Sequence, residues 1–404
     1  MKLILWTLPN SGLQTMSHLS AMLSQFGASH KDITVKTSVL INKTLWQRLF
    51  SCKRKDPDFE LPDLVEIPHY WTALFSKMDF LENLSKLDKN LSVADCIEPL
   101  KPHCFLPGSK KIHSVPWWMS VTALHYRVDH LKKITKDPEN FLKTWDGMLK
   151  ACSKLKKIFR SPDYFPIANS SLKGSLNLRE VLPFIWENGG DLFNADLTQA
   201  TVDREQSIKA IKDFLVLFKK GFMPLMRERG SLGTMMEGKA SMVLTRRQSQ
   251  AVSDKNAQTH IPLKTLPAPG KYESSVSFMT SYNLAILKSS NKKKHALKLL
   301  KWLTRVDSSV EYSKSIQAFP CSTKGFEQFI FSSHERMKTY AEIVAKARCL
   351  PSTPVCATYV GLLDEVLSRV CRDIVKGRYK SDLLPKEMAR VKAEVDYLIS
   401  LYGD

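Results

Sequence analysis

Short apolar runs alternate with amphipathic segments along the first hundred residues, and this order limits the possible fold more than any other feature. Lys2–Leu8 is strand-like, Leu13–Phe26 carries apolar residues at helical spacing, and Ile33–Leu40 alternates with a period of two. Leu45–Phe50 has a helical pattern again, and Leu64–Ile67 has that of a buried strand. This alternation predicts an α/β layer structure with a mainly parallel sheet, whose ligands bind outside the carboxyl ends of the strands.

The rest of the chain repeats this alternation. Leu178–Trp186 is predicted to be a helix that ends at the glycine pair 189–190, because glycine adopts left-handed backbone most easily. Pro262–Gly270 contains three prolines and is predicted to be a turn-rich connection, after which Val276–Leu287 has strand character. Further helices are predicted at Val128–Lys133, Phe141–Phe159, Asp203–Lys220, Lys292–Thr304, Glu335–Ala347 and within Tyr359–Leu401.

A chain of 404 residues is longer than one hydrophobic core usually supports, so we expect two lobes. No internal repeat or low-complexity linker separates them in the sequence, which indicates that the lobes are interleaved along the chain. A chain that passes several times between two lobes forms a hinge of several strands, which lets rigid lobes close on a ligand.

The net charge of +20 would attract nucleic acid, anionic lipid or acidic ligands. The basic residues are dispersed along the sequence, however, which favours an ordinary solvated surface. No nucleic-acid-binding motif is present, so nucleic acid is not an expected partner.

The eight cysteines have no CxxC or zinc-type spacing, so the sequence predicts neither a metal site nor a cofactor. Most are expected to be small buried hydrophobic residues, although Cys96 with Cys104, or Cys349 with Cys356, could pair in an oxidising compartment. Lys2–Leu8 is too short for a secretory signal core, so either a signal has been removed or the protein acts in the cytoplasm.

Several stretches, in this order and spacing, carry a family resemblance over nearly the whole chain. They are Pro62–Phe75, Val115–Leu131, Lys143–Leu149, Val181–Phe193, Met236–Val243, Ser281–Lys301, Ala318–Lys324 and the tail helices through Val395. The chain resembles the extracellular solute-binding proteins of ABC transporters in the carbohydrate-uptake class, the relatives of maltose-binding protein. The resemblance implies a two-lobed periplasmic-binding-protein fold of type II, in which each lobe is a mainly parallel sheet flanked by helices.

The resemblance also implies lobes of residues 1–113 with 277–318 and of 114–276 with 319–404, and a ligand cleft between them. It implies a monomeric, non-catalytic protein that captures a mono- or oligosaccharide by hinge closure and delivers it to an ABC transporter permease. The expected location is periplasmic or extracytoplasmic and membrane-associated, with the cytoplasm as the alternative.

A sugar site needs flat aromatic walls for C–H faces together with fixed partners for hydroxyl groups. The candidates are aromatic and polar residues near strand or helix ends, where the resemblance places cleft loops. They are Trp6, Asn10, His69, Tyr70, Trp71, Trp117, Trp118, Trp186, Glu187, Asn188, Tyr282, Asn283 and Phe319. Neighbouring residues of a strand point to opposite faces, so one of Trp117 and Trp118 is expected to pack while the other reaches the ligand. Trp46, Trp145 and Trp302 are expected to pack within amphipathic helices.

After the strand Ser241–Leu244, many relatives continue with a small glycine-containing turn and an aromatic residue, whereas this chain has Arg246 and Arg247. Guanidinium groups form bidentate bonds to carboxylates and phosphates. These two residues are therefore ligand-binding candidates too, and they suggest the hypothesis of an anionic or phosphorylated saccharide.

Two other classes of function are weighed against solute capture. The first is a repurposed binding fold that acts as a cytoplasmic sensor or a scaffold for another protein. The second is an enzyme, which the sequence disfavours because it contains no GxSxG, HExxH or glycine-rich phosphate loop. Asp63 and Glu66 could be imagined as an acid and base pair, but they are expected to face solvent.

Overall fold

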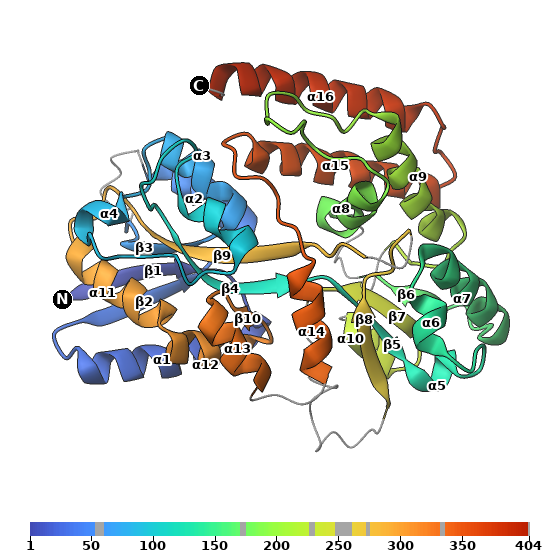
Figure 1. Cartoon of the computed structure of the whole chain (residues 1–404), viewed down its shortest axis with the longest axis horizontal. Coiled ribbons are helices and arrows are strands. Elements are labelled where there is room, and N and C mark those ends of the chain that lie inside the picture. The colour runs from blue at the N-terminus through green and yellow to red at the C-terminus, as the bar shows by residue number, and fades with distance from the viewer. Residues whose placement is uncertain are drawn as a thin grey trace. The chain divides into compact units, whose positions relative to one another are not determined.

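The computed structural model describes residues 1–52, 60–169, 175–225, 231–246, 261–271, 275–331 and 336–402. The chain divides into two compact units and passes between them several times (Figure 1). Unit 1 comprises Met1–Ser120, Thr280–Ser333 and Cys349–Cys356, and unit 2 comprises Val121–Met279, His334–Arg348 and Ala357–Asp404. Unit 1 therefore includes residues 319–333 and 349–356, which the resemblance assigns to the second lobe.

Unit 1 is built on a six-stranded sheet with the order β10-β4-β9-β3-β1-β2. The strands are β1 (Lys2–Thr7), β2 (Thr34–Val39), β3 (Leu64–Pro68), β4 (Val115–Val121), β9 (Met279–Ile286) and β10 (Phe319–Pro320). β1 pairs in parallel with β2 and β3, whereas β9 runs antiparallel to β3, and β10 runs antiparallel to β4. Strands β1 and β3 lie inside the sheet and have apolar residues on both faces, which explains their continuous hydrophobic runs.

Helices and short 3-10 turns accompany this sheet. The helices of unit 1 are α1 (Thr15–Ser29), α2 (Asn42–Ser51), α3 (Thr72–Lys77), α4 (Leu84–Leu87), α11 (Lys293–Thr304), α12 (Val306–Ile316) and α13 (Thr323–Phe331), and the 3-10 turns are η1 (Gly12–Gln14), η2 (His69–Trp71) and η3 (Glu98–Cys104). In α1, Leu19, Met22 and Phe26 are buried at intervals of three and four residues, which is the face that the sequence pattern predicts.

Unit 2 contains a four-stranded sheet with the order β6-β7-β5-β8. Its strands are β5 (Ala123–Arg127), β6 (Phe165–Ala168), β7 (Ala240–Thr245) and β8 (Leu263–Pro267). β5 is antiparallel to both β7 and β8, and β6 is parallel to β7. One side of this sheet packs a small apolar cluster that includes Ala168, Met235 and Val243.

The helices of unit 2 are α5 (Val128–Leu131), α6 (Pro138–Leu142), α7 (Trp145–Ile158), α8 (Leu178–Glu187), α9 (Glu205–Lys219), α10 (Ser231–Met236), α14 (Arg336–Ala345), α15 (Cys356–Val375), whose first residue belongs to unit 1, and α16 (Leu383–Tyr402). Helix α7 begins at an N-cap in which the Thr144 hydroxyl accepts the Gly147 amide at 3.1 Å, a bond that stabilises a helix by about 1 kcal/mol. None of the helices in the described ranges combines the length and apolarity needed to span a bilayer.

The two-unit α/β fold is confirmed, with two corrections of detail. The sheets are mixed and not mainly parallel, because β9 runs antiparallel to β3, and β5 runs antiparallel to β7 and β8. The interpretation of Pro262–Gly270 as a turn-rich connection is wrong, because Leu263–Pro267 forms β8. This strand lies at the edge of its sheet, where proline is tolerated since one row of backbone groups needs no partner.

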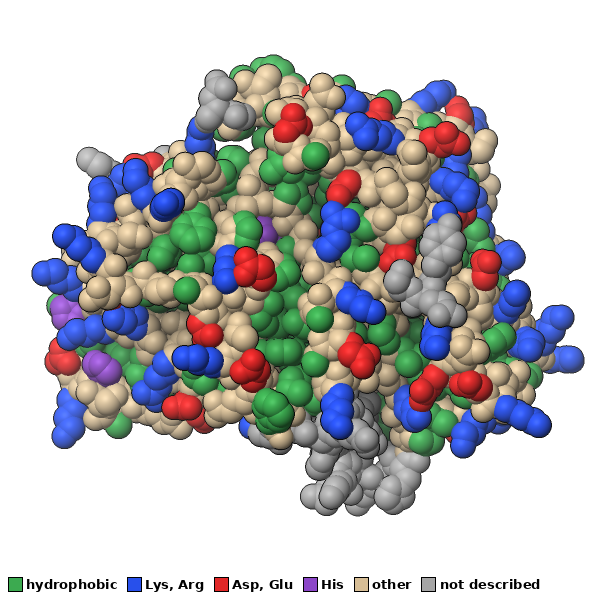
Figure 2. Space-filling view, viewed as in Figure 1, with side chains coloured by type: hydrophobic (Ala, Val, Ile, Leu, Met, Phe, Trp, Pro, Cys, Tyr) green, Lys and Arg blue, Asp and Glu red, His purple; other side chains and the backbone are tan. Residues whose placement is uncertain are grey.

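Surface charge and cysteines follow the sequence expectations. Figure 2 shows Lys and Arg side chains spread over the face in view, interspersed with acidic residues and without a single basic stripe. All eight cysteines are free thiols, and all except the half-buried Cys349 are buried. The prediction that most cysteines act as small core residues is therefore confirmed.

Candidate functional site

Glu66 in β3 is the centre of a buried hydrogen-bond network in unit 1. Its side chain is fully buried, and its carboxyl oxygens accept the Thr7 hydroxyl, the Leu8 amide at 3.1 Å and the Trp118 Nε1–H at 2.8 Å. The Asn10 Nδ2 lies 3.0 Å from each carboxyl oxygen. Burial raises the pKa of Glu66, while these donors act in the opposite direction. The network ties the segment after β1 to β3 and β4.

Trp118 and Tyr282 form an aromatic pair next to Glu66. They come from β4 and β9, which are neighbours in the sheet, and their rings stack with centroids 4.2 Å apart and planes inclined by 17°. Asn10 and Trp118 each retain 8% of their surface exposed and Tyr282 retains 9%, so a small part of each residue stays accessible. The structure thus brings together three predicted site residues from distant parts of the chain, with one indole held in place by a buried carboxyl.

Other predicted residues of unit 1 lie in the core. Trp117 is fully buried and stacks on Tyr312, with the ring centroids 4.2 Å apart and the planes inclined by 1°. Phe319 is also fully buried and packs edge-on against Phe326 and Phe329. Because nothing of these two side chains reaches the surface, we leave them out of the proposed contact set.

Trp71 and Trp6 have packing roles as well. Trp71 packs edge-on against Trp46 and Phe75, with ring centroids 4.9 and 5.9 Å apart. Trp6 is 2% exposed, and the Arg48 guanidinium lies 5.9 Å from its ring centroid. These neighbours are side chains of helices that cover the sheet, so both tryptophans hold helices against it.

His69, Tyr70 and Asn283 complete the predicted set in unit 1. The Nδ1 of His69 lies 3.1 Å from the Ser281 carbonyl oxygen, and the His69 ring is fully buried. Tyr70 follows His69 in η2 and is 5% exposed. The Asn283 amide is fully buried and donates to the Ser114 hydroxyl at 2.9 Å, so it has a structural role.

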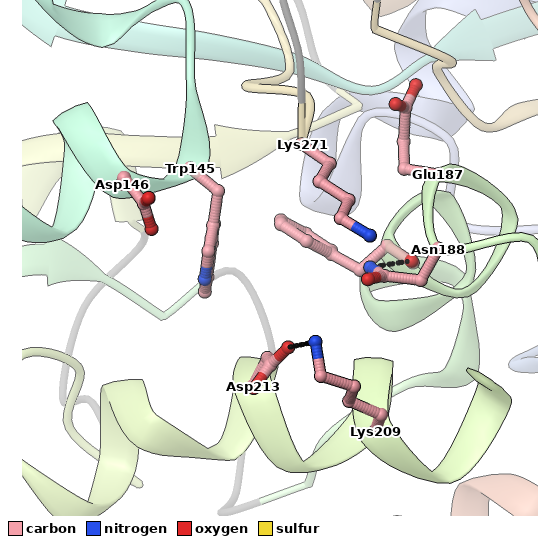
Figure 3. Close-up of a pocket in the computed structure, with 8 residues that line it drawn as sticks. Trp145, Asp146, Glu187, Asn188, Lys209, Asp213 and Lys271 are labelled. Carbon is pink, nitrogen blue, oxygen red and sulfur yellow. Dashed lines mark hydrogen bonds and ion pairs between the residues drawn. The ribbon is translucent and has the colours of Figure 1, made fainter. Parts of the chain in front are cut away.

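Unit 2 contains a pocket of about 210 Å³ at the carboxyl end of α8 (Figure 3). It is lined by Trp145, Asp146, Phe184, Glu187, Asn188, Lys209, Asp213 and Lys271. Two of these, Glu187 and Asn188, are predicted site residues. Trp145 forms one wall and packs edge-on against Phe184, with the ring centroids 4.3 Å apart.

The polar groups of the pocket are held from several sides. Glu187 Oε1 accepts the Val276 amide at 2.5 Å, and burial raises the pKa of this carboxyl. The Asn188 Nδ2 donates to the Phe184 carbonyl at 2.8 Å, and in Figure 3 the Lys271 ammonium points toward Asn188. An indole wall with an amide and charged groups of both signs is a chemical setting that suits hydroxyl-rich molecules.

Trp186 points into different surroundings. Its Nε1 donates to Asp191 at 3.0 Å, and the Arg348 guanidinium lies 4.4 Å from the centroid of its ring. Arg348 also pairs with Asp191 at 2.7 Å, and Phe278 stacks on the indole at 6.2 Å. With 7% exposure, Trp186 offers an edge and not a free face.

Of the two arginine candidates, the structure describes only Arg246. Arg247 lies outside the described residues. Arg246 follows β7 and is half-buried, and its positive charge acts to lower the pKa of Asp364, although burial dominates and raises that pKa. Arg246 therefore already has a protein carboxyl group nearby.

Sequence reasoning missed the accessible side of Trp145 and misplaced Asp63 and Glu66. The packing expected of Trp145 is real, but this residue begins α7, where a first-turn side chain keeps one side open to the pocket. The expectation that both carboxyls face solvent is wrong, because Asp63 is 4% exposed and Glu66 is fully buried. Asp63 accepts the Ile4 amide at 2.9 Å and the Ser290 hydroxyl at 2.6 Å, which indicates a structural role.

Comparisons with known proteins agree with this fold. A family model described as bacterial extracellular solute-binding protein matches residues 21–343. An ABC transporter solute-binding protein of Thermotoga lettingae, solved with α-D-tagatose, is similar with a TM-score of 0.81 and 18% identity over 98% of this chain and 99% of that one. No curated protein sequence matches significantly.

Two further solved structures have the same fold. The GacH receptor of Streptomyces glaucescens, solved unliganded and with acarbose, has a TM-score of 0.79 and 15% identity over 100% of this chain and 99% of that one. The sugar-binding protein MalE of Xanthomonas citri has a TM-score of 0.76 and 17% identity over 99% of this chain and 98% of that one.

Proposed function

This chain belongs to the bacterial extracellular solute-binding protein family, and we propose that it captures a mono- or oligosaccharide for delivery to an ABC transporter permease. The similar structures carry tagatose and acarbose or are described as sugar-binding, which supports a carbohydrate ligand. In this proposal the two units are the lobes that close on the sugar, and the protein acts as a monomeric, non-catalytic carrier. It works outside the cytoplasm, as the extracellular family description implies.

The observation that carries the proposal is the aromatic pair of Trp118 and Tyr282, assembled beside Asn10 around buried Glu66. The accessible parts of the two stacked rings offer apolar contacts to sugar C–H groups, while the Asn10 side chain and the tyrosine hydroxyl provide polar partners for hydroxyl groups. The carboxyl of Glu66 fixes the indole before any ligand arrives, which lowers the entropy lost on binding.

In unit 2 we assign the contacts to the carboxyl end of α8, from Trp186 to Asn188. The carboxyl and amide there would reject analogues that lack the matching hydroxyl group, because a buried polar group would then lose its partner. Arg246 and Arg247 extend the set of ligands to acidic saccharides, which therefore belong in the test panel.

The test is isothermal titration against neutral and acidic saccharides with the wild type, Trp118→Ala, Asn188→Ala and the exposed control Asn90→Ala. Removing an aromatic wall is expected to weaken binding about 10- to 100-fold, which corresponds to about 1.4 to 2.8 kcal/mol. Asn90→Ala is expected to bind like the wild type, since its side chain is exposed and belongs to neither proposed contact set.

The pattern of loss separates the site from the function. If Trp118→Ala binds like the wild type while Asn188→Ala does not, saccharide capture stands but the aromatic pair is not its site. Absence of heat with every neutral and acidic saccharide would refute the carbohydrate proposal itself.

A further inference from the structure

Two histidines and one cysteine of unit 1 come together although they are distant in the sequence. Nitrogen atoms of His69 and His103 and the sulfur of Cys349 all lie within 4.8 Å of one another. His69 belongs to η2, His103 to η3, and Cys349 is the residue at which the chain returns to unit 1. Because no two of these residues are close in sequence, no spacing motif reveals them.

The histidine rings are held in orientations that suit a metal ligand. The Nδ1 of His69 lies 3.1 Å from the Ser281 carbonyl oxygen and 3.2 Å from both the Ser281 backbone nitrogen and the Thr280 hydroxyl, so groups of β9 hold this ring in place. The His103 ring is hydrogen-bonded to the backbone of Leu350, while its Nδ1 is buried and has no hydrogen-bond partner among the described residues. A bond from one ring nitrogen to a backbone carbonyl is the usual support of a metal-binding histidine.

The buried Nδ1 of His103 is the observation that points to a ligand. A buried polar atom without a partner costs about 1 to 3 kcal/mol, so such atoms are rare unless something satisfies them. The ring of His69 stands edge-on to that of His103, with centroids 4.3 Å apart, and both rings border Cys349.

We propose that His69, His103 and Cys349 form a binding site for a divalent transition-metal ion, with Zn²⁺ as the preferred ion. Two imidazoles and a thiolate suit Zn²⁺, whereas Mg²⁺ and Ca²⁺ require oxygen ligands. Tetrahedral Zn²⁺ with bonds of about 2.0 to 2.3 Å places its ligand atoms about 3.3 to 3.8 Å apart, so side-chain movements of about an ångström close the site. Three protein ligands leave the fourth position for water.

Access and proton balance are consistent with this site. Cys349 is half-buried, whereas His69 and His103 are buried, so Cys349 is the most accessible residue of the three. The ion binds the thiolate, so the thiol proton passes to water as the metal–sulfur bond forms. Binding is therefore expected to weaken as the pH falls.

A bound ion would fix the returning segment Cys349–Cys356 to the turn that carries His69 and Tyr70. It would thereby stiffen the backbone beside the proposed sugar contacts. The metal site does not depend on the nature of the solute, and it is tested without any saccharide.

The experiment uses the full chain after treatment with a chelator. Equilibrium dialysis is expected to give one Zn²⁺ per chain, and Co²⁺ is expected to give the charge-transfer absorption of a thiolate ligand. Cys349→Ser and His103→Gln should each lower the affinity about tenfold or more. The matched control Cys356→Ser, which removes a buried thiol from the same returning segment, should bind like the wild type.

A second measurement needs only the wild type, in case a variant does not fold. Zn²⁺ is expected to protect Cys349 from alkylation, as measured on its peptide by mass spectrometry, and to raise the melting temperature. The proposal is overturned if Co²⁺ gives no thiolate absorption, if Cys349 is alkylated equally fast with Zn²⁺, or if Cys349→Ser binds the ion as tightly as Cys356→Ser.

Discussion

Replacing Glu66 with glutamine tests whether the buried network needs a carboxyl group with two accepting oxygens. Oε1 accepts the Trp118 Nε1–H, and Oε2 accepts the Leu8 amide and the Thr7 hydroxyl, with Asn10 shared between them. Glutamine keeps the shape but turns one oxygen into an NH₂ group. The new NH₂ group points toward either Trp118 or Leu8. The N–H groups of both residues can only donate hydrogen bonds, so one of them then faces another donor.

The expected loss follows from this geometry. One orphaned and buried N–H costs about 1 to 3 kcal/mol, so Glu66→Gln should lose about 1 to 3 kcal/mol of unfolding free energy. If the amide turns its NH₂ toward Trp118, the double variant with Trp118→Phe should cost less than the sum of the single changes.

Urea denaturation at neutral pH, followed by circular dichroism, measures this loss. Glu98→Gln is the matched control, because Glu98 is largely exposed and forms a surface ion pair with Lys101 across one turn of η3. That change should stay within about 0.5 kcal/mol of the wild type. An equally small effect of Glu66→Gln would refute the reasoning, since it would mean that the network accepts an NH₂ group in place of an accepting oxygen.

Two further predictions concern stability. Burial, with smaller effects of nearby charges, lowers the pKa of His130 from 6.5 to about 4, so the unfolded chain takes up a proton first as the pH falls. The stability that His130 contributes is complete above pH 6.5 and is lost as the pH falls toward 4. Urea denaturation across this range should show that the unfolding free energy of His130→Gln falls less with pH than that of the wild type, by up to about 3 kcal/mol. An equal fall in both proteins would contradict this. In Gly190→Ala the new Cβ would lie 2.5 Å from the Ser207 hydroxyl and 3.1 Å from its Cα, so thermal melts should show a loss of about 1 to 3 kcal/mol. Gly233→Ala, which meets nothing within 4 Å, should be neutral or stabilising, and equal behaviour of the two variants would count against the packing argument.

The local elements could be predicted from the sequence because their signals are short-range. The apolar alternation in Lys2–Leu8 and Ile33–Leu40 predicts β1 and β2, and the spacing in Leu13–Phe26 predicts α1. The helix that ends at the glycine pair was also predictable, since Gly189 has a φ of 78°, where a side chain is strained. The division into interleaved units follows from length and from the absence of a linker.

The site depended on contacts that no local pattern contains. The sequence indicates that Trp117 and Trp118 point to opposite sides of a strand, but only the tertiary structure places Tyr312 against one and Tyr282 against the other. In the same way, the acidic residue at position 66 looks like a surface carboxyl until the segment after β1 surrounds it with donors.

The sequence alone determines on which face of a helix or strand a residue lies, because the apolar periodicity reports it. What covers that face is decided by other segments, some of them about 200 residues away in the chain. His69, His103 and Cys349 illustrate this limit, because they meet only after the chain has passed through unit 2 and returned. The tertiary structure therefore decides which polar groups are buried together, and with them the chemistry of the protein.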